Sequence, residues 1–181
     1  MDDTDSSALR KRGEPVTLCV EETVIGTVGI AERDGCLTNL FFERDRVLPE
    51  SEHGETELLR EGFRQLNSYL RGELREFSLP LAPAGTPFMR EVWHQLATIP
   101  YGALATYKEI ATALGNPLAA RAVGMANHRN PLPLFFPCHR VVGSDGSLTG
   151  YRGGLALKKA LLSLEQHAMP SERRCILDAA Q

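Results

Sequence analysis

The sequence predicts two domains: a small N-terminal α/β domain built on an antiparallel sheet, followed by a mostly helical C-terminal domain with a helix-turn-helix. Residues 16–46 carry short runs of β-branched and aromatic residues separated by turn residues, a pattern typical of antiparallel strands. Residues 86–126 carry closely spaced helix start and stop signals. Between them, residues 77–85 are rich in proline and alanine and indicate an interdomain linker. A chain of 181 residues is long enough for two such domains.

The first domain is expected over residues 14–84, after a polar segment, residues 1–13, that is expected to be disordered. Its expected elements are strands over 16–20, 24–30 and 37–42, turns at 21–23 and 34–35, an acidic linker over 49–55, and a helix over 57–74. Four apolar side chains of that helix recur at helical spacing and share one face: Leu59, Phe63, Leu66 and Leu70. That face is expected to cover the sheet.

The second domain is expected over residues 85–168, and the tail 169–181 gives no usable signal. Thr86-Pro87 is a helix start, and the single tryptophan, Trp93, is interpreted as a core residue of that helix. Thr106 and Glu109 form a capping-box pattern, which predicts a helix start between them. The later expected helices span 107–114, 117–126 and 155–165, the last with Leu157, Leu161 and Leu164 inward. The middle two, joined by a Gly-Asn-Pro turn, have helix-turn-helix proportions.

The net charge of −3 argues against a protein that binds nucleic acid over its whole surface. The charge is unevenly distributed, however. Residues 1–85 carry 10 basic and 17 acidic side chains, whereas residues 86–168 carry 8 basic and 4 acidic ones. Only the C-terminal half is therefore suited to approach a polyanion.

The composition also indicates a compartment. No run of eighteen apolar residues is present, and the acidic N-terminus lacks the apolar core of a secretory signal. The four cysteines are too few and too scattered for a disulfide scaffold. We therefore expect an intracellular protein with free thiols, in the cytoplasm or the nucleus depending on its source, and no membrane partner.

The segment Phe136 to Val141, with the sequence Phe-Pro-Cys-His-Arg-Val, is the candidate centre of chemistry. A thiol beside His139 and Arg140 lies in a positive field, which lowers its pKa and favours the nucleophilic thiolate. Neighbouring residues rarely face each other, so His139 needs a bridging water or a turn to reach Cys138. The alternative is a small buried cysteine with exposed basic neighbours.

No metal or other cofactor is expected. Cys19 and Cys36 are seventeen residues apart, no Cys-x-x-Cys pair exists, and His53 and His94 lack ligand spacing.

From Gly85 to Glu165 the chain resembles the O6-alkylguanine-DNA alkyltransferases, or methylated-DNA–protein-cysteine methyltransferases. The most specific match is Pro-Cys-His-Arg-Val, and the N-terminal half resembles the family only in general layout. The matching segments are Gly85-Thr86-Pro87-Phe88, Ile99-Pro100-Tyr101-Gly102, Thr106-Tyr107, Ala119 to Gly124, Asn130-Pro131, Pro137 to Val141, Gly150 to Leu155, Lys158, Leu161, Leu162 and Glu165. The resemblance implies a winged-helix-like C-terminal domain.

The resemblance also implies a reaction. Cys138 would take the alkyl group, usually methyl, from O6 of guanine and also from O4 of thymine in DNA. The thioether product is not reversed, so each protein molecule would react once and be inactivated. Glu165 would orient His139, which would accept the thiol proton through a water. Tyr107 would contact the flipped base and donate a proton or hydrogen bond, and Asn130 would position the active-site turn and the helix pair.

The implied partner is double-stranded DNA containing O6-alkylguanine, bound by a protein expected to be monomeric. Arg121 would fill the gap left when the base flips through the minor groove. The small residues around it, which would let the helix approach closely, are Ala119, Ala120, Ala122 and Gly124. The implied pocket residues are Val141, Tyr151, Arg152 and Gly153. Because Arg152 is larger than the residue some members carry here, tolerance of bulky alkyl groups is in doubt.

Three rival functions are open at this point. A non-catalytic sensor of alkyl lesions would lack the nucleophile, so Cys138 argues against it. A helix-turn-helix regulator without chemistry would bind specific sequences even without this cysteine. A Cys-His hydrolase would turn over esters or amides many times, but no oxyanion-hole signature is apparent.

Overall fold

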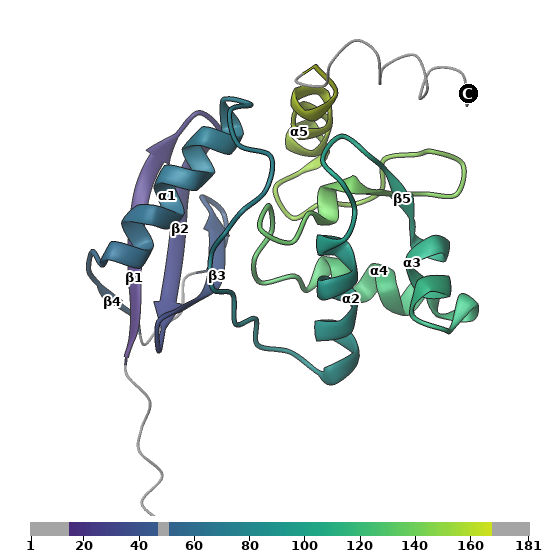
Figure 1. Ribbon diagram of the computed structural model, residues 1–181, viewed down its shortest axis with the longest axis horizontal. Helices are drawn as coiled ribbons and strands as arrows, with labels where there is room; N and C mark the ends of the chain where they lie inside the picture. The colour runs from purple at the N-terminus through teal and green to yellow at the C-terminus, as the bar shows by residue number, and fades with distance from the viewer. Residues whose placement is uncertain (1–14, 47–50, 168–181) are drawn as a thin grey trace, which may run out of the picture.

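The computed structural model describes residues 15–46 and 51–167, and within them it has a sheet domain and a helical domain side by side (Figure 1). The expectations for residues 1–13 and 169–181 lie outside the described residues. Within the described part of the chain, no helix is long and apolar enough to cross a membrane.

The N-terminal sheet has four strands in the order β3-β2-β1-β4. They are β1 (Val16–Thr23), β2 (Gly26–Arg33), β3 (Cys36–Phe42) and β4 (Ser51–His53). The antiparallel meander of the first three strands is confirmed. The prediction of a linker over 49–55 is wrong in part, because residues 51–53 form β4 and pair with β1 in parallel.

The first hairpin turns later than predicted. The turn at 21–23 is wrong, since β1 continues to Thr23 and the chain reverses at Val24 and Ile25. Thr23 stabilises this position, because its Oγ1 donates to the Gly26 carbonyl at 2.7 Å and accepts from the Ile25 amide at 3.2 Å. Gly26 has φ 98°, a conformation that favours glycine. The turn at Asp34 and Gly35 is confirmed.

The helix α1 (Glu57–Leu70) packs on the sheet through the predicted face, whose four apolar side chains are all buried. It ends four residues before the predicted end. Gly72 adopts φ 76° and its amide bonds to the Tyr69 carbonyl, which closes the helix. Tyr69 is also buried, on the side of α1 that faces the C-terminal domain's Tyr101 and His139.

The C-terminal domain begins with α2 (Pro87–Ala97), capped by Thr86 as predicted. Trp93 is 1% exposed and its Nε1 donates to the Ala126 carbonyl at 2.9 Å, which confirms it as a core residue. Gly85 is required here, because a Cβ at that position would lie 2.5 Å from the Trp93 ring.

The helix-turn-helix consists of α3 (Tyr107–Ala113), the 3₁₀ turn η1 (Pro117–Ala119) and α4 (Ala120–His128). The capping box of Thr106 and Glu109 is confirmed. The predicted helix over 117–126 begins instead as a 3₁₀ turn, because Asn116 makes no side-chain capping bond and the α-helix starts only at Ala120. The short strand β5 (Ala105–Thr106), just before α3, pairs in parallel with β6 (Val141–Val142).

The last helix is α5 (Leu155–His167), and its inward face differs from the prediction. Leu161 is buried as expected, but Leu157 and Leu164 are only half-buried. The helix is rotated so that two charged side chains, Lys158 and Glu165, face the interior and find polar partners there. An apolar periodicity rule assigns such residues to the solvent side and so misplaces the face.

Candidate active site

Cys138 lies in a 3₁₀ turn, η2 (Cys138–Arg140), between an apolar run and β6. The apolar run, residues 131–137, is irregular, and residues 141–142 after the turn are extended. In a 3₁₀ turn, successive side chains point about 120° apart. The turn therefore points the three side chains in different directions, and those of His139 and Arg140 both meet Glu165.

His139 and Glu165 form a fully buried pair. His139 Nε2 lies 2.9 Å from Glu165 Oε1, and both side chains are 0% exposed. Glu165 also accepts hydrogen bonds from Arg140 Nε at 3.0 Å and from the Gly102 amide at 2.9 Å. Burial alone would raise the pKa of this carboxyl, but its hydrogen bonds to His139 and Arg140 lower the pKa to about 2. Glu165 is therefore an anion throughout the physiological range.

His139 is held as a neutral base. Burial lowers the pKa of its imidazole, and the hydrogen bond and charge of Glu165 only partly oppose this. A neutral imidazole that donates Nε2–H to Glu165 leaves Nδ1 unprotonated. Nδ1 is buried and has no hydrogen-bond partner among the described residues. It is thus the nitrogen available to take a proton.

The predicted lowering of the pKa of Cys138 is wrong in direction. Cys138 is only 7% exposed, and burial raises the pKa of its thiol despite a hydrogen bond from Asn130 and the charges of Lys158 and Arg152. Arg140, one expected source of the positive field, pairs with Glu165. The resting protein therefore holds a neutral thiol, whose ionisation requires a base.

Asn130 directly follows α4 and braces the segment before the cysteine. Its Nδ2 donates to the Phe136 carbonyl at 2.9 Å, and its Oδ1 accepts from the Leu132 amide at 3.0 Å. The side chain also bonds the thiol. Asn130 thus connects the end of the helix pair to the cysteine turn, the position its predicted role requires.

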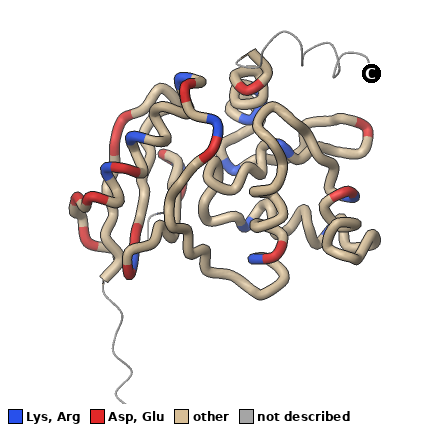
Figure 2. The backbone as a smooth tube through the Cα atoms, in the orientation of Figure 1, with Lys and Arg blue, Asp and Glu red and all other residues tan. Residues whose placement is uncertain are grey.

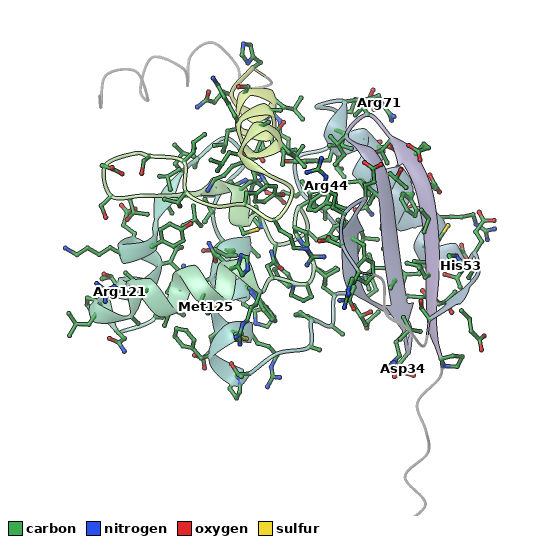
Figure 3. The ribbon with its side chains drawn as sticks, turned by 180° about the vertical axis from the view of Figure 1, so that it is seen from behind. Asp34, Arg44, His53, Arg71, Arg121 and Met125 are labelled. Atoms are coloured by element: carbon green, nitrogen blue, oxygen red, sulfur yellow. The ribbon has the colours of Figure 1, made fainter. Side chains whose placement is uncertain are left out.

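A cavity of about 420 Å³ gathers several of the residues expected to meet DNA. It is lined by Tyr107, Ala120, Arg121, Gly124, Ser144 and Thr149. Arg121 and Met125, one turn apart on α4, are both exposed, and Arg121 lies toward the end of the helix farther from the N-terminal domain (Figure 3). Ala122 is also exposed, and Ala119 and Ala120 are half-buried. The Tyr107 hydroxyl lies 2.7 Å from Thr149 Oγ1, a partner that sequence reasoning missed.

The surface charge agrees with the predicted asymmetry. Figure 2 shows most of the acidic positions on the sheet domain and few around α3 and α4. The face that carries Arg121 is the less acidic one.

The expected pocket residues differ in what they contact. The Val141 carbonyl accepts from Lys158 Nζ at 2.6 Å, and the Tyr151 ring lies 6.4 Å from that of His139. Gly153 has no room for a side chain, since a Cβ would lie 2.6 Å from Leu157. The roles of these three residues toward a base stay predictions.

Arg152 reaches across to the N-terminal domain. Its Nε donates to Asp45 Oδ2 at 2.8 Å, and its other nitrogens donate to the carbonyls of Leu40 and Asn130 at 2.8 and 3.1 Å. Its guanidinium is therefore engaged at the domain interface. The expected limit on bulky alkyl groups, which rested on the size of Phe135, Phe136 and Arg152, stays a prediction.

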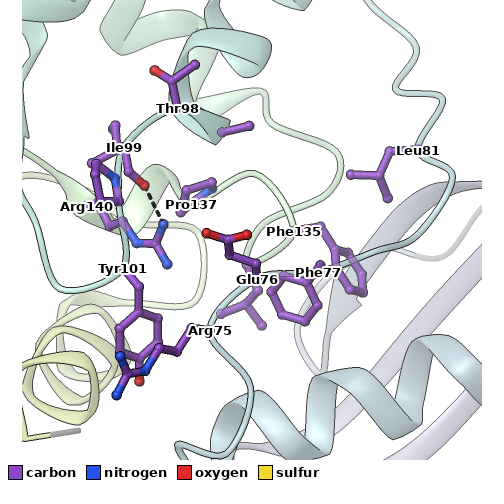
Figure 4. A pocket seen from close by; sticks show the side chains of 13 residues that line it. Arg75, Glu76, Phe77, Leu81, Thr98, Ile99, Tyr101, Phe135, Pro137 and Arg140 are labelled. Atoms are coloured by element: carbon purple, nitrogen blue, oxygen red, sulfur yellow. Dashed lines mark hydrogen bonds between the residues drawn. The ribbon is translucent and has the colours of Figure 1, made fainter. Parts of the chain in front are cut away.

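A second cavity, of about 370 Å³, lies behind the site between the domains. Figure 4 shows Arg140, Tyr101 and Arg75 along one part of its lining and Phe77 and Phe135 along another, with the bond from Arg140 to the Ile99 carbonyl at 2.7 Å.

Sequence reasoning missed four contributors to the site: Tyr69, Gly102, Arg140 as the partner of Glu165, and Lys158 as a structural donor. Lys158 had a visible signal, because it shares a helical face with Leu161 and Leu162. Tyr69 had none, since its hydroxyl meets Glu165 across a separation of 96 residues. In residues 15–46 and 51–167, no group of three His, Cys, Asp or Glu side chains is placed to hold a metal, and the expected absence of metal stays a prediction.

The fold and site define a class: a protein with a sheet domain and a helix-turn-helix domain, whose buried cysteine directly precedes a histidine that is hydrogen-bonded to a glutamate. Comparison with known proteins specifies it further. Residues 19–83 match the 6-O-methylguanine DNA methyltransferase ribonuclease-like domain, and residues 87–167 match the DNA-binding domain of the same family. The chain belongs to the 6-O-methylguanine DNA methyltransferase family.

Several relatives are similar over most of their length. A methylated-DNA–protein-cysteine methyltransferase of Methanosarcina barkeri is 46% identical, over 81% of this chain and 94% of the relative. The constitutive enzyme of that name from Bacillus subtilis is 45% identical, over 80% and 92%. The OGT protein of Mycobacterium tuberculosis, solved in complex with DNA, superposes with a TM-score of 0.80 at 40% identity, over 87% of this chain and 98% of that one.

Proposed function

We propose that this protein repairs DNA by transferring an alkyl group, methyl above all, from O6 of guanine to Cys138. The observation that carries the proposal is a buried thiol on Cys138 followed in the chain by His139, a buried imidazole that the carboxylate of Glu165 orients at 2.9 Å. The relatives named for transfer from methylated DNA to a protein cysteine support the substrate. O4 of thymine is a second proposed donor.

The reaction begins with proton removal. The thiol proton passes through a bridging water to Nδ1 of His139, and Glu165 stabilises the imidazolium that forms. The sulfur then attacks the alkyl carbon in line, a carbon–sulfur bond forms, and the bond from that carbon to O6 breaks. The electron pair stays on the guanine, which Tyr107 stabilises by donating a hydrogen bond or a proton.

Each protein molecule reacts once, because a thioether is a poor leaving group and nothing in the proposed mechanism regenerates the thiol. The protein is consumed as a reagent rather than recycled. No cofactor takes part in the proposed steps. This single turnover distinguishes the proposal from a Cys-His hydrolase.

The cavity beside α4 supports a step in which the damaged base flips out of the duplex. A base inside the duplex must leave the stack, at a cost of a few kcal/mol. Arg121, which lines the cavity beside α4, would fill the gap from the minor groove. We further propose that the protein acts as a monomer inside the cell, in the cytoplasm or nucleus that holds its DNA.

The test is the replacement of the sulfur. Cys138→Ala should abolish alkyl uptake from methylated DNA and leave DNA binding largely intact, because the thiol is buried and outside the lining of that cavity. Mass spectrometry of tryptic peptides should place the added methyl on Cys138 of the unaltered protein, and Cys36→Ala serves as control. Methyl transfer to the Cys138→Ala variant would overturn the assignment. Sequence-specific binding without any alkyl uptake by the unaltered protein would favour the regulator.

A further inference from the structure

One side chain of the N-terminal domain, that of Tyr69, contacts both His139 and Glu165. Tyr69, on the last turn of α1, donates its hydroxyl hydrogen to Glu165 Oε1 at 2.6 Å. The same hydroxyl oxygen lies 3.1 Å from His139 Nε2. All three side chains are fully buried, so the contact lies inside the molecule, where hydrogen bonds are electrostatically strong.

The hydrogen-bond directions in this triangle are determined by what each group can donate. Glu165 is an anion and only accepts, so the Tyr69 O–H must point to it. The tyrosine oxygen then presents its lone pairs to His139 Nε2–H. Tyr69 therefore supports the same tautomer as Glu165 does, with Nδ1 left as the base.

Packing alone does not explain the hydroxyl. The Tyr69 ring packs against the rings of Phe77 and Tyr101, at centroid distances of 5.2 and 6.0 Å, and phenylalanine would keep those contacts. Tyr101 offers a direct comparison. Its ring is buried beside the same network, yet its hydroxyl has no hydrogen-bond partner among the described residues.

We propose that Tyr69 is a positioning residue for alkyl transfer: its hydroxyl, supplied by the N-terminal domain, holds Glu165 and His139 in the geometry that takes the proton from Cys138. The sheet domain thereby forms part of the active site rather than only a scaffold. This inference rests on the proposed function for its physiological reaction, but the proton transfer it concerns can be measured with any alkyl donor.

The proposal predicts a defect that depends on pH. Tyr69 acts through the base, and the base is needed only while the thiol is protonated. Raising the pH ionises the thiol without help, so the defect should shrink. The unaltered protein and Tyr69→Phe have in common the other charged and titratable groups that face the triangle: Arg75, Tyr101, Cys138, Arg140, Tyr151 and Lys158.

The experiment compares Tyr69→Phe with Tyr101→Phe in the full chain. Methylation of Cys138 by DNA containing O6-methylguanine, and its alkylation by iodoacetamide, are timed by peptide mass at about pH 7 and about pH 9.5. We expect Tyr69→Phe to slow both reactions about tenfold at the lower pH and by a clearly smaller factor at the higher one, where more of the thiol ionises without the base. Tyr101→Phe should remain within about twofold at both, and the DNA affinity of both variants should be unchanged.

Each other outcome is decisive. A Tyr69→Phe rate equal to that of the unaltered protein at the lower pH, or a defect of the same size at both pH values, would overturn the positioning role. If Tyr69→Phe proves unstable in thermal unfolding, Tyr69→4-aminophenylalanine keeps the ring and restores a donor, and it should restore the rate. Failure of that variant to exceed the Tyr69→Phe rate would equally contradict the proposal. If methylated DNA does not modify the unaltered protein, the proposed function fails, while the iodoacetamide rates still test Tyr69.

Discussion

Burial rather than local positive charge determines how the cysteine works. The motif Pro-Cys-His-Arg-Val suggested a thiol activated by its basic neighbours, but Arg140 is committed to Glu165 and the thiol is a buried neutral group. Reactivity then depends on a base that is itself uncharged. The buried His139, with its free Nδ1, meets this requirement.

The ionisation of His139 predicts a pH dependence of stability. Because the pKa of His139 is lower in the folded protein than in the unfolded chain, the unfolded chain binds more protons in acid. The contribution of this group is thus fully favourable above about pH 6.5, the unfolded value, and is lost progressively below it. Denaturant unfolding between about pH 5 and 7 should show the free energy of unfolding falling in acid.

His139→Gln removes the titrating group and is the matched variant for this measurement. Its free energy of unfolding should fall less steeply over the same range. Parallel slopes for the variant and the unaltered protein would show that His139 is not buried in its neutral form.

At the scale of elements, capping signals were the most informative part of the sequence. Thr86 and Thr106 begin helices where predicted, because a side-chain oxygen there satisfies a backbone amide that has no partner within the helix. Turns and buried polar helix faces were harder to predict from the sequence. The first hairpin is fixed by a bond between Thr23 and Gly26, which follows no periodic pattern. The orientation of α5 is fixed by bonds of Lys158 and Glu165 to groups that are distant along the chain.

The capping box of α3 should contribute measurably to stability. Thr106→Ala removes the acceptor for the Glu109 amide, a bond of 3.1 Å, and should lower the free energy of unfolding by about 1 kcal/mol. Thr112→Ala, at an exposed position within the same helix, is the control and should change it much less. Chemical denaturation measures both, and equal losses would mean that the box adds nothing beyond helix propensity.

The exposed face of α4 should matter for duplex DNA and not for the alkyl transfer itself. Arg121→Ala should slow repair of duplex DNA several-fold more than reaction with a free O6-alkylguanine base, since only the duplex requires a gap to be filled. Arg129→Ala, at the exposed end of α4 and outside the cavity lining, provides the matched loss of charge. Equal losses on both substrates for Arg121→Ala would remove the gap-filling role.

At the scale of the whole molecule, the sequence predicted two domains and their classes but not how they join. The linker over 77–85 was expected to separate them, yet it lies against β3, with the Leu37 amide bonded to the Pro80 carbonyl at 2.8 Å. Arg152 and Tyr69 then connect the domains through Asp45 and Glu165. Such contacts join residues about 100 positions apart, and neither periodicity nor capping patterns carry information about them.

The candidate site was predicted unevenly for the same reason. Cys138 and His139 are adjacent in the chain, so their motif was visible, and Glu165 entered only through the resemblance to a family. Of the polar partners that hold Glu165, only His139 was predicted, because Tyr69, Gly102 and Arg140 lie outside any recognisable pattern with Glu165. In the structure, the residues of this short motif belong to a hydrogen-bond network that includes side chains of both domains.

The central claim is a single, irreversible alkyl transfer to one sulfur, and the stoichiometry of intact protein tests it most directly. Incubation with an excess of DNA containing O6-methylguanine should raise the mass of the chain by one methyl group and then stop, with one lesion lost per protein molecule. Lesions lost well beyond one equivalent, or a chain whose mass never changes while lesions disappear, would contradict the account.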